Sequence, residues 1–212
     1  MPTPSTTQST LQPAKSSNVT QRTTLTLWEI PGSLLVTHAF SEKAKQEIRD
    51  KQAKKAKKAK AERHPDEEFQ AAKMMNAQGR ECVPVTALKK AIVTAATAFD
   101  DLTKVALRQA IFVRPADDPA AMLVPIETHS GAPAVGTMRE DAVTIGINTR
   151  GLVYRPQYPE WQLRVEIEYN PRLVSTEQLL ALVDHAGWGV GICEGRPEKT
   201  SALGWGRFQR ME

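Results

Sequence analysis

The sequence has few cysteines, few aromatic residues and no long apolar stretch, and each absence excludes a class of protein. Its two cysteines, Cys82 and Cys193, are too far apart for a metal-binding pair and too few for a disulfide framework, so we expect two reduced thiols. No run of about 18 apolar residues is present, which excludes a membrane-spanning helix. The first residues lack the charged and then apolar pattern of a signal peptide, so we expect a cytoplasmic protein.

The common nucleotide and metal motifs are also missing. There is no Walker A sequence and no GxGxxG directly after an expected strand. Acidic pairs such as Asp100-Asp101 and Asp117-Asp118 fall in expected loops, where acids usually form caps and turns. We therefore expect no cofactor, no metal ion and no enzymatic activity.

What the chain does contain is enough apolar residues for a core. Hydrophobic residues make up 41% of the 212 positions, which suits one domain. Residues 1–22 are rich in Ser, Thr, Gln and Pro and carry few large apolar side chains, so we expect a disordered tail there. A single domain is expected over residues 23–212.

Positive charge is concentrated in residues 42–64, which we call the basic segment. The chain has a formal net charge of +4, but this segment holds ten lysines and arginines against four acids. Its composition predicts a helix over residues 41–63 that Ser41 caps, with no large apolar side chain beyond Ile48. The helix should therefore project into solvent and present a local positive field that attracts polyanions.

Apolar periodicity predicts the remaining elements. Alternation is clearest in the last long strand, where apolar residues face one side and charged residues the other. The expected strands are 23–30, 110–113, 122–126, 142–145, 152–154, 161–169 and 204–211. The expected helices are 65–75, 84–99 and 176–186, the last of which begins with a capping box of Ser175 and Gln178 and ends at Gly187.

The order of these elements predicts an α+β fold with a ferredoxin-like, split βαβ core. Two strand–helix–strand units follow one another, and the two helices should cover one face of the sheet. The core should carry two insertions, a basic helical one at 41–80 and a Pro/Gly-rich, β-rich one at 114–160. The other sheet face would then be free for a ligand or partner.

Glycine is concentrated near the end of the chain, in residues 187–208, which we call the glycine segment. Six of the 12 glycines fall there, close to two tryptophans and several cations. Free amides, cations and flat rings suit the phosphates and bases of a nucleic acid. We expect Trp205 to be available for stacking and Trp188, directly after a helix, to lie in the core.

Three stretches carry a resemblance to a known family. They are residues 31–38 (PGSLLVTH), residues 83–91 (VPVTALKKA) and residues 189–197 (GVGICEGRP) with 206–208 (GRF). On these, the chain resembles the RAMP superfamily, whose RRM-like members include backbone subunits of CRISPR effector complexes, and it resembles small phage-encoded proteins of that type. The resemblance implies nucleic-acid binding by copies that line up along a strand, with the basic insertion as a finger or thumb.

We therefore expect a protein that binds single-stranded nucleic acid, DNA or RNA, without sequence preference, as a homo-oligomer or filament and without membrane contacts. Phosphates would meet the basic segment and the glycine segment, in a salt-sensitive interaction. The predicted contact residues are Lys51, Lys54, Lys55, Lys57, Lys58, Arg63, Arg196, Lys199, Trp205 and Arg207.

Two alternatives remain open at this point. RAMP-like nucleases use an isolated histidine as general base, and His38 is the candidate for that role in a metal-independent endonuclease. Alternatively, the basic segment could bind an acidic protein surface, which would make this a structural or regulatory phage protein.

Overall fold

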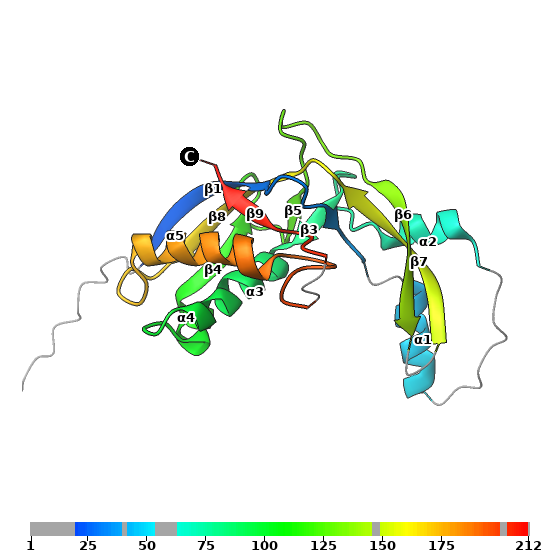
Figure 1. Ribbon diagram of the computed structural model, residues 1–212, viewed down its shortest axis with the longest axis horizontal. Coiled ribbons are helices and arrows are strands. Elements are labelled where there is room, and N and C mark those ends of the chain that lie inside the picture. The colour runs from blue at the N-terminus through cyan, green and yellow to red at the C-terminus, as the bar shows by residue number, and fades with distance from the viewer. Residues whose placement is uncertain (1–19, 40–41, 54–62, 146–148, 200–202, 212) are drawn as a thin grey trace, which may run out of the picture.

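The computed structural model describes residues 20–39, 42–53, 63–145, 149–199 and 203–211. Nearly all of the expected tail, 1–22, lies outside these residues. The described chain forms a core of sheet and helices and an arm that extends to one side (Figure 1). Helices and antiparallel sheets are both present, which confirms the predicted α+β class.

Four strands make the main sheet of the core, and all neighbours in it are antiparallel. Its order is β4 (Ile111–Pro115), β8 (Gln162–Tyr169), β1 (Gln21–Glu29) and β9 (Phe208–Arg210). Leu25 and Leu27 of β1 and Leu163 of β8 are buried on one face, as alternation requires. The strands predicted at 23–30 and 161–169 are confirmed, whereas the last strand is shorter than predicted.

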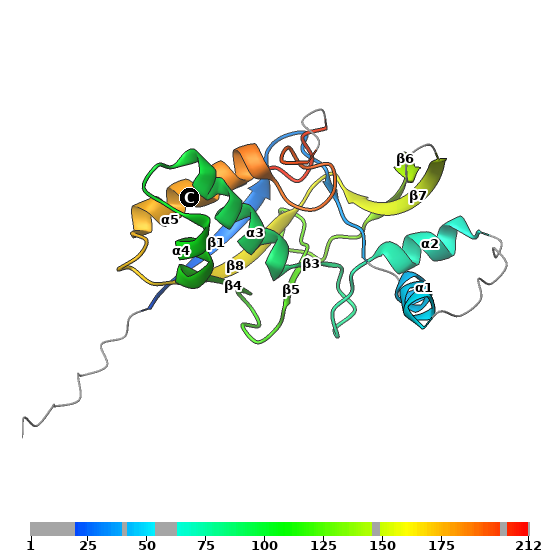
Figure 2. The same ribbon diagram turned by 90° about the horizontal axis from the view of Figure 1, so that it is seen from below.

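Two helices, α3 (Val85–Ala95) and α5 (Thr176–His185), lie together against one face of this sheet (Figures 1 and 2). Leu88 of α3 and Leu182 of α5 are fully buried between them and the strands. The predicted capping box is confirmed, because the Ser175 hydroxyl accepts from the Gln178 amide while the Gln178 side chain accepts from the Ser175 amide. A 3₁₀ turn η1 (Ala96–Ala98) and α4 (Lys104–Ala110) follow α3.

The end of α5 differs from the prediction. The chain does not stop at a left-handed Gly187 but continues through a π-helical turn, η2 (Ala186–Val190), in which Gly187 has no positive φ. A Cβ at Gly187 would lie 1.9 Å from the carbonyl oxygen of Phe208. Glycine is needed here for close packing against β9, not as a helix cap.

The arm consists of α1 (Glu42–Gln52), α2 (Pro65–Ala72) and a sheet of β2 (Leu35–Val36), β7 (Thr149–Tyr158) and β6 (Thr137–Ile145). Contacts between α2 and β7 hold its two layers together (Figure 2). The β6–β7 hairpin is much longer than the strands predicted at 142–145 and 152–154. No described β6 side chain is buried, so this strand has no apolar face that a sequence pattern could display.

A short sheet of β3 (Cys82–Pro84) and β5 (Leu123–Pro125) lies beside the main sheet, and a buried carboxylate beside β3 fastens the arm to the core. Glu81 is bound by the ammonium of Lys73 at 2.9 Å, the hydroxyl of Tyr158 at 2.5 Å and the amide of Gly136 at 2.9 Å. Burial and this hydrogen bond raise the pKa of Tyr158 far above its ordinary value, which keeps the phenol a donor.

Candidate nucleic-acid interface

The glycine segment and the first turns of α3 line a cleft of about 320 Å³. Residues 190–194 of the glycine segment line one side, and α3 contributes Thr86 and Lys90. Thr37 and His38, directly after β2, line the same space, together with Arg196. The cleft thus unites His38 and Arg196, which the sequence indicated, with Lys90, which the sequence analysis did not name as a contact residue.

Left-handed backbone gives the glycine segment its shape. Gly191, Gly195 and Gly206 have φ values of 70°, 64° and 65°, a region open to glycine at little cost. Gly206 is also sterically required, because a Cβ there would lie 2.0 Å from the carbonyl oxygen of Ile192. Cys193, with φ of 61°, is the one non-glycine residue of the described chain in this region. These backbone conformations and close contacts restrict the glycine segment to one backbone path.

Backbone hydrogen bonds join this segment to the chain around β2. The Glu194 amide donates to the carbonyl of Val36 at 3.0 Å, and the Gly206 amide donates to that of Leu34 at 2.7 Å. The hydroxyl of the buried Ser33 donates to the carbonyl of Gly204 at 3.0 Å. These bonds place His38, two residues beyond Val36, beside the glycine segment at the cleft.

The start of α3 offers the cleft unneutralised backbone dipoles. Pro84 occupies the N-cap position and makes no side-chain cap, and the first turn holds no acidic residue. The Val85 amide donates to the carbonyl of Met122 at 3.0 Å. Thr86 and Ala87, and then Lys90 and Ala91 one turn later, line the cleft. A helix start of this kind favours an anion, and the exposed Lys90 adds a full positive charge one turn on.

Arg196 is engaged within the glycine segment. Its Nε donates to Glu198 at 2.9 Å and its Nη1 to the carbonyl of Cys193 at 2.7 Å, so the guanidinium closes the turn around the left-handed Cys193. Only 11% of the Arg196 side chain is exposed. Glu194 and Glu198 also line the cleft and offset part of its positive charge. A contact from Arg196 to nucleic acid stays a prediction.

Two titratable side chains of the cleft are held in their neutral forms. Partial burial, and next the charge of Arg155, lower the pKa of His38, while Glu194 acts in the opposite direction. The imidazole is therefore uncharged at neutral pH. Burial raises the pKa of the Cys193 thiol to about 12, so this sulfur is not a thiolate nucleophile at physiological pH.

The two tryptophans of the glycine segment differ in exposure, and the prediction for Trp188 is wrong. Trp188 was predicted to lie in the core, but 64% of it is exposed, because the π-helical turn carries it outward. Trp205 is half-buried: it lies directly over Gly195, and the guanidinium of Arg139 in β6 is 4.5 Å from its ring centroid. Arg207 stacks on Trp188 at 4.1 Å.

The predicted contact residues of the basic segment lie in and beyond α1. Lys51 belongs to α1, and Arg63 precedes α2, where it pairs with Glu68, donates to the carbonyl of Leu152 at 2.8 Å and lies over the ring of Tyr154. Arg63 thus joins the basic segment to β7. Lys199, in the glycine segment, is exposed. The residues outside the described part of the chain are Lys54, Lys55, Lys57 and Lys58.

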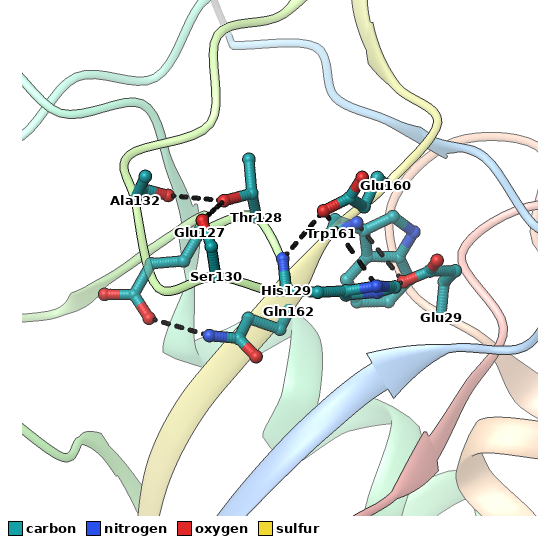
Figure 3. Close-up of polar contacts among 9 residues, drawn as sticks. All are labelled: Glu29, Glu127, Thr128, His129, Ser130, Ala132, Glu160, Trp161 and Gln162. Carbon is teal, nitrogen blue, oxygen red and sulfur yellow. Dashed lines mark hydrogen bonds and ion pairs between the residues drawn. The ribbon is translucent and has the colours of Figure 1, made fainter.

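A second polar cluster, which the sequence did not indicate, lies at the end of β1 (Figure 3). The ring of His129 stacks on Trp28 with centroids 4.1 Å apart, and its Nε2 is 2.6 Å from Glu29. Glu160 accepts from the His129 backbone amide at 2.9 Å and lies 3.9 Å from Nδ1. Both ring nitrogens therefore face carboxylates, and the cluster fastens the loop around His129 to the sheet.

Within the described residues, no three His, Cys, Asp or Glu side chains gather as a metal ion would require. None of the helices that the structure describes is long and apolar enough to cross a membrane.

Comparison with known proteins assigns no family to the chain. No protein-family model matches it, and no curated protein matches its sequence. Among solved structures, it is similar to Cmr6 from Pyrococcus furiosus, with a TM-score of 0.42 and 12% identity over 91% of this chain and 99% of that one. A likeness of this degree establishes neither family nor activity, so the RAMP resemblance stays an expectation.

Proposed function

We propose that this protein binds single-stranded nucleic acid through a RAMP-like, ferredoxin-like core, holding phosphates at the cleft and attracting them with the basic segment. The sheet order β4-β8-β1-β9, with α3 between β1 and β4 in sequence and α5 between β8 and β9, supports the split βαβ part of the proposal. The phage origin rests on the sequence resemblance alone.

The observation that carries the proposal is the cleft itself. A helix start without a side-chain cap or acids, the cation of Lys90 and a wall formed by residues 190–198 of the glycine segment meet in one place. The helix start and the cation favour a phosphate, and Gly191 leaves that part of the wall without a side chain. A nucleic acid has a phosphate at every nucleotide, so a strand bound at the cleft could also contact a second cationic region of the protein.

The basic segment is that second region. The glycine segment lies on the side of the core that faces the arm (Figure 1), and Trp205 touches Arg139 of β6. A strand held at the cleft would therefore run toward the arm that contains α1, and the basic segment would add phosphate contacts. Such contacts position the strand without reading its sequence, and neighbouring copies would continue along it.

Fluorescence anisotropy of labelled single-stranded DNA, single-stranded RNA and duplex DNA, titrated at several salt concentrations, tests the proposal. We expect single strands to bind more tightly than the duplex, with a steep salt dependence. Replacing Lys54, Lys55, Lys57 and Lys58 by Glu should abolish binding at physiological salt, and each lost phosphate contact should lower the salt slope by about 0.7 for a single strand.

Two single variants distinguish a specific contact at the cleft from a general effect of the protein's net charge on binding. Lys90→Glu should weaken binding by about tenfold or more, because it reverses a charge at the proposed phosphate position. Lys104→Glu, which makes the same change on α4 outside the cleft lining, should change it little. Equal effects of the two variants would contradict a phosphate site in the cleft, and no binding at low salt would refute the nucleic-acid proposal.

A second candidate, a metal-independent endoribonuclease, is favoured by one observation. His38 lines the cleft and its pKa is lowered, so a neutral imidazole is available as a general base at neutral pH. This candidate predicts cleavage of single-stranded RNA in the presence of EDTA that His38→Ala abolishes. Intact RNA after prolonged incubation with the wild-type protein would leave binding as the function.

A further inference from the structure

We propose that Trp188, braced by Arg207, is a stacking platform for one base of the bound single strand. This inference rests on the proposed function and names the group that meets a base, as distinct from those that meet phosphates. The sequence assigned stacking to Trp205, and a base contact from Trp205 stays a prediction.

The other tryptophans are already occupied. All four tryptophans belong to the described part of the chain, so they can be compared directly. Trp161 is fully buried, Trp28 is stacked on His129, and Trp205 is packed over Gly195 with Arg139 at its ring. Trp188 has one ring face against the guanidinium of Arg207, and its 64% exposure leaves the other face to solvent.

The platform is held in place from the buried interior. The hydroxyl of Ser33, which is 3% exposed, accepts the backbone amide of Arg207 at 2.7 Å. The Arg207 side chain in turn donates from Nε to the carbonyl of Trp188 at 3.1 Å, so one arginine grips both the backbone and the ring of Trp188. Gly187 fixes the approach, since its neighbour Phe208 leaves no room for a Cβ.

The arrangement fits a nucleobase. A flat indole with one open face stacks on any base, which agrees with binding that does not depend on sequence. The guanidinium of Arg207 places positive charge against the ring, and a ring already held in one orientation loses little entropy on stacking. Trp188 would then contact a base, and the cleft would contact the phosphates of the same strand.

Trp188→Ala should weaken binding of a single strand about 5- to 150-fold, the equivalent of about 1–3 kcal/mol for one stacked base. Its salt slope should equal that of the wild type, because no phosphate contact is lost. Trp188→Phe should retain most of the affinity. The matched control is Leu203→Ala, which removes another exposed apolar side chain of the glycine segment and should bind like the wild type.

Two further readouts identify stacking. Binding should quench tryptophan emission in the wild type and much less in Trp188→Phe, which keeps the other three tryptophans. A strand made of abasic residues should bind the wild type and Trp188→Ala equally. The platform is refuted if Trp188→Ala binds the normal strand as the wild type does, or if it loses as much affinity for the abasic strand. Absence of any binding by the wild type would instead refute the proposed function, and this inference with it.

Discussion

The glycine segment and the basic segment are built in opposite ways. The first is bound to the chain around β2 by hydrogen bonds from Glu194 and Gly206, and its path depends on left-handed residues that few side chains allow. The second is rich in strong helix formers, has no large apolar residue after Ile48, and is joined to β7 by Arg63 at its far end.

This difference corresponds to two separate requirements of binding, a fixed site geometry and long-range electrostatic attraction. A site that must hold a phosphate or a base at a fixed distance needs a backbone that cannot move, and the glycine segment supplies it. A region that only raises the local concentration of a polyanion needs charge and reach, and tolerates loose attachment. Substitution of the left-handed glycines in the first should therefore destabilise the protein, whereas changes of charge in the second should act mainly on binding.

The largest effect on stability is expected from Gly206→Ala. A Cβ there would lie 2.0 Å from the carbonyl oxygen of Ile192, at a φ of 65°. Left-handed strain and overpacking together should lower the free energy of unfolding by about 2–5 kcal/mol. Urea denaturation followed by circular dichroism measures this loss.

Gly204→Ala is the matched control for that variant. Its φ of 63° is nearly the same, but its nearest neighbour is the flexible Arg207 side chain at 3.7 Å. It should cost only the conformational strain, about 1–2 kcal/mol. Equal losses from the two alanines would mean that the segment shifts to accept a Cβ, and the contrast between rigid and loose segments would fail.

A smaller effect is expected at the arm from Arg63→Ala. Its ion pair with Glu68 is substantially exposed, so the free energy of unfolding should fall by less than about 1 kcal/mol. Hydrogen exchange should be faster in β7 around Leu152 and unchanged in β8 of the core. Arg63→Lys keeps the charge but loses the paired hydrogen bonds, and should show the same local change. Faster exchange throughout the core would contradict a loosely attached segment.

The smallest effect concerns pH. Because the pKa of His38 is lowered from 6.5 in the folded protein, the unfolded chain binds more protons than the folded one as the pH falls below that value. Acidification should therefore destabilise the wild type slightly more than His38→Gln. Thermal melting of both proteins between pH 7 and pH 5 measures the difference. Parallel curves would mean that His38 is not protected from protons at the cleft.

Sequence patterns predicted an element correctly where one of its faces is buried, or where the residues that stabilise it are close together in the sequence. The alternation in β8 and the capping box at Ser175 were predicted because each is a property of a few consecutive residues. The β6–β7 hairpin was underestimated because β6 is held by pairing with β7 and not by burial. The π-helical turn that exposes Trp188 has no local signature.

The cleft shows a further limit of sequence reasoning. Its lining comes from residues 37–38, Met74, 84–91 and 190–198, which no periodicity connects. The sequence does contain a signal for Lys90, because Pro84 predicts the start of α3 and the first turn lacks acids. What could not be predicted is that the glycine segment passes beside that helix start.

The position of β1 also has a consequence for how the protein is made. β1 pairs with β8 and β9, and Glu29 at its end contacts Trp161, 132 residues later in the chain. At synthesis rates of about 5–20 residues per second, β1 waits on the order of ten seconds for its first partner. During that time its alternating leucines have no sheet to join, so the nascent chain should be a candidate for chaperone binding until β8 has emerged from the ribosome.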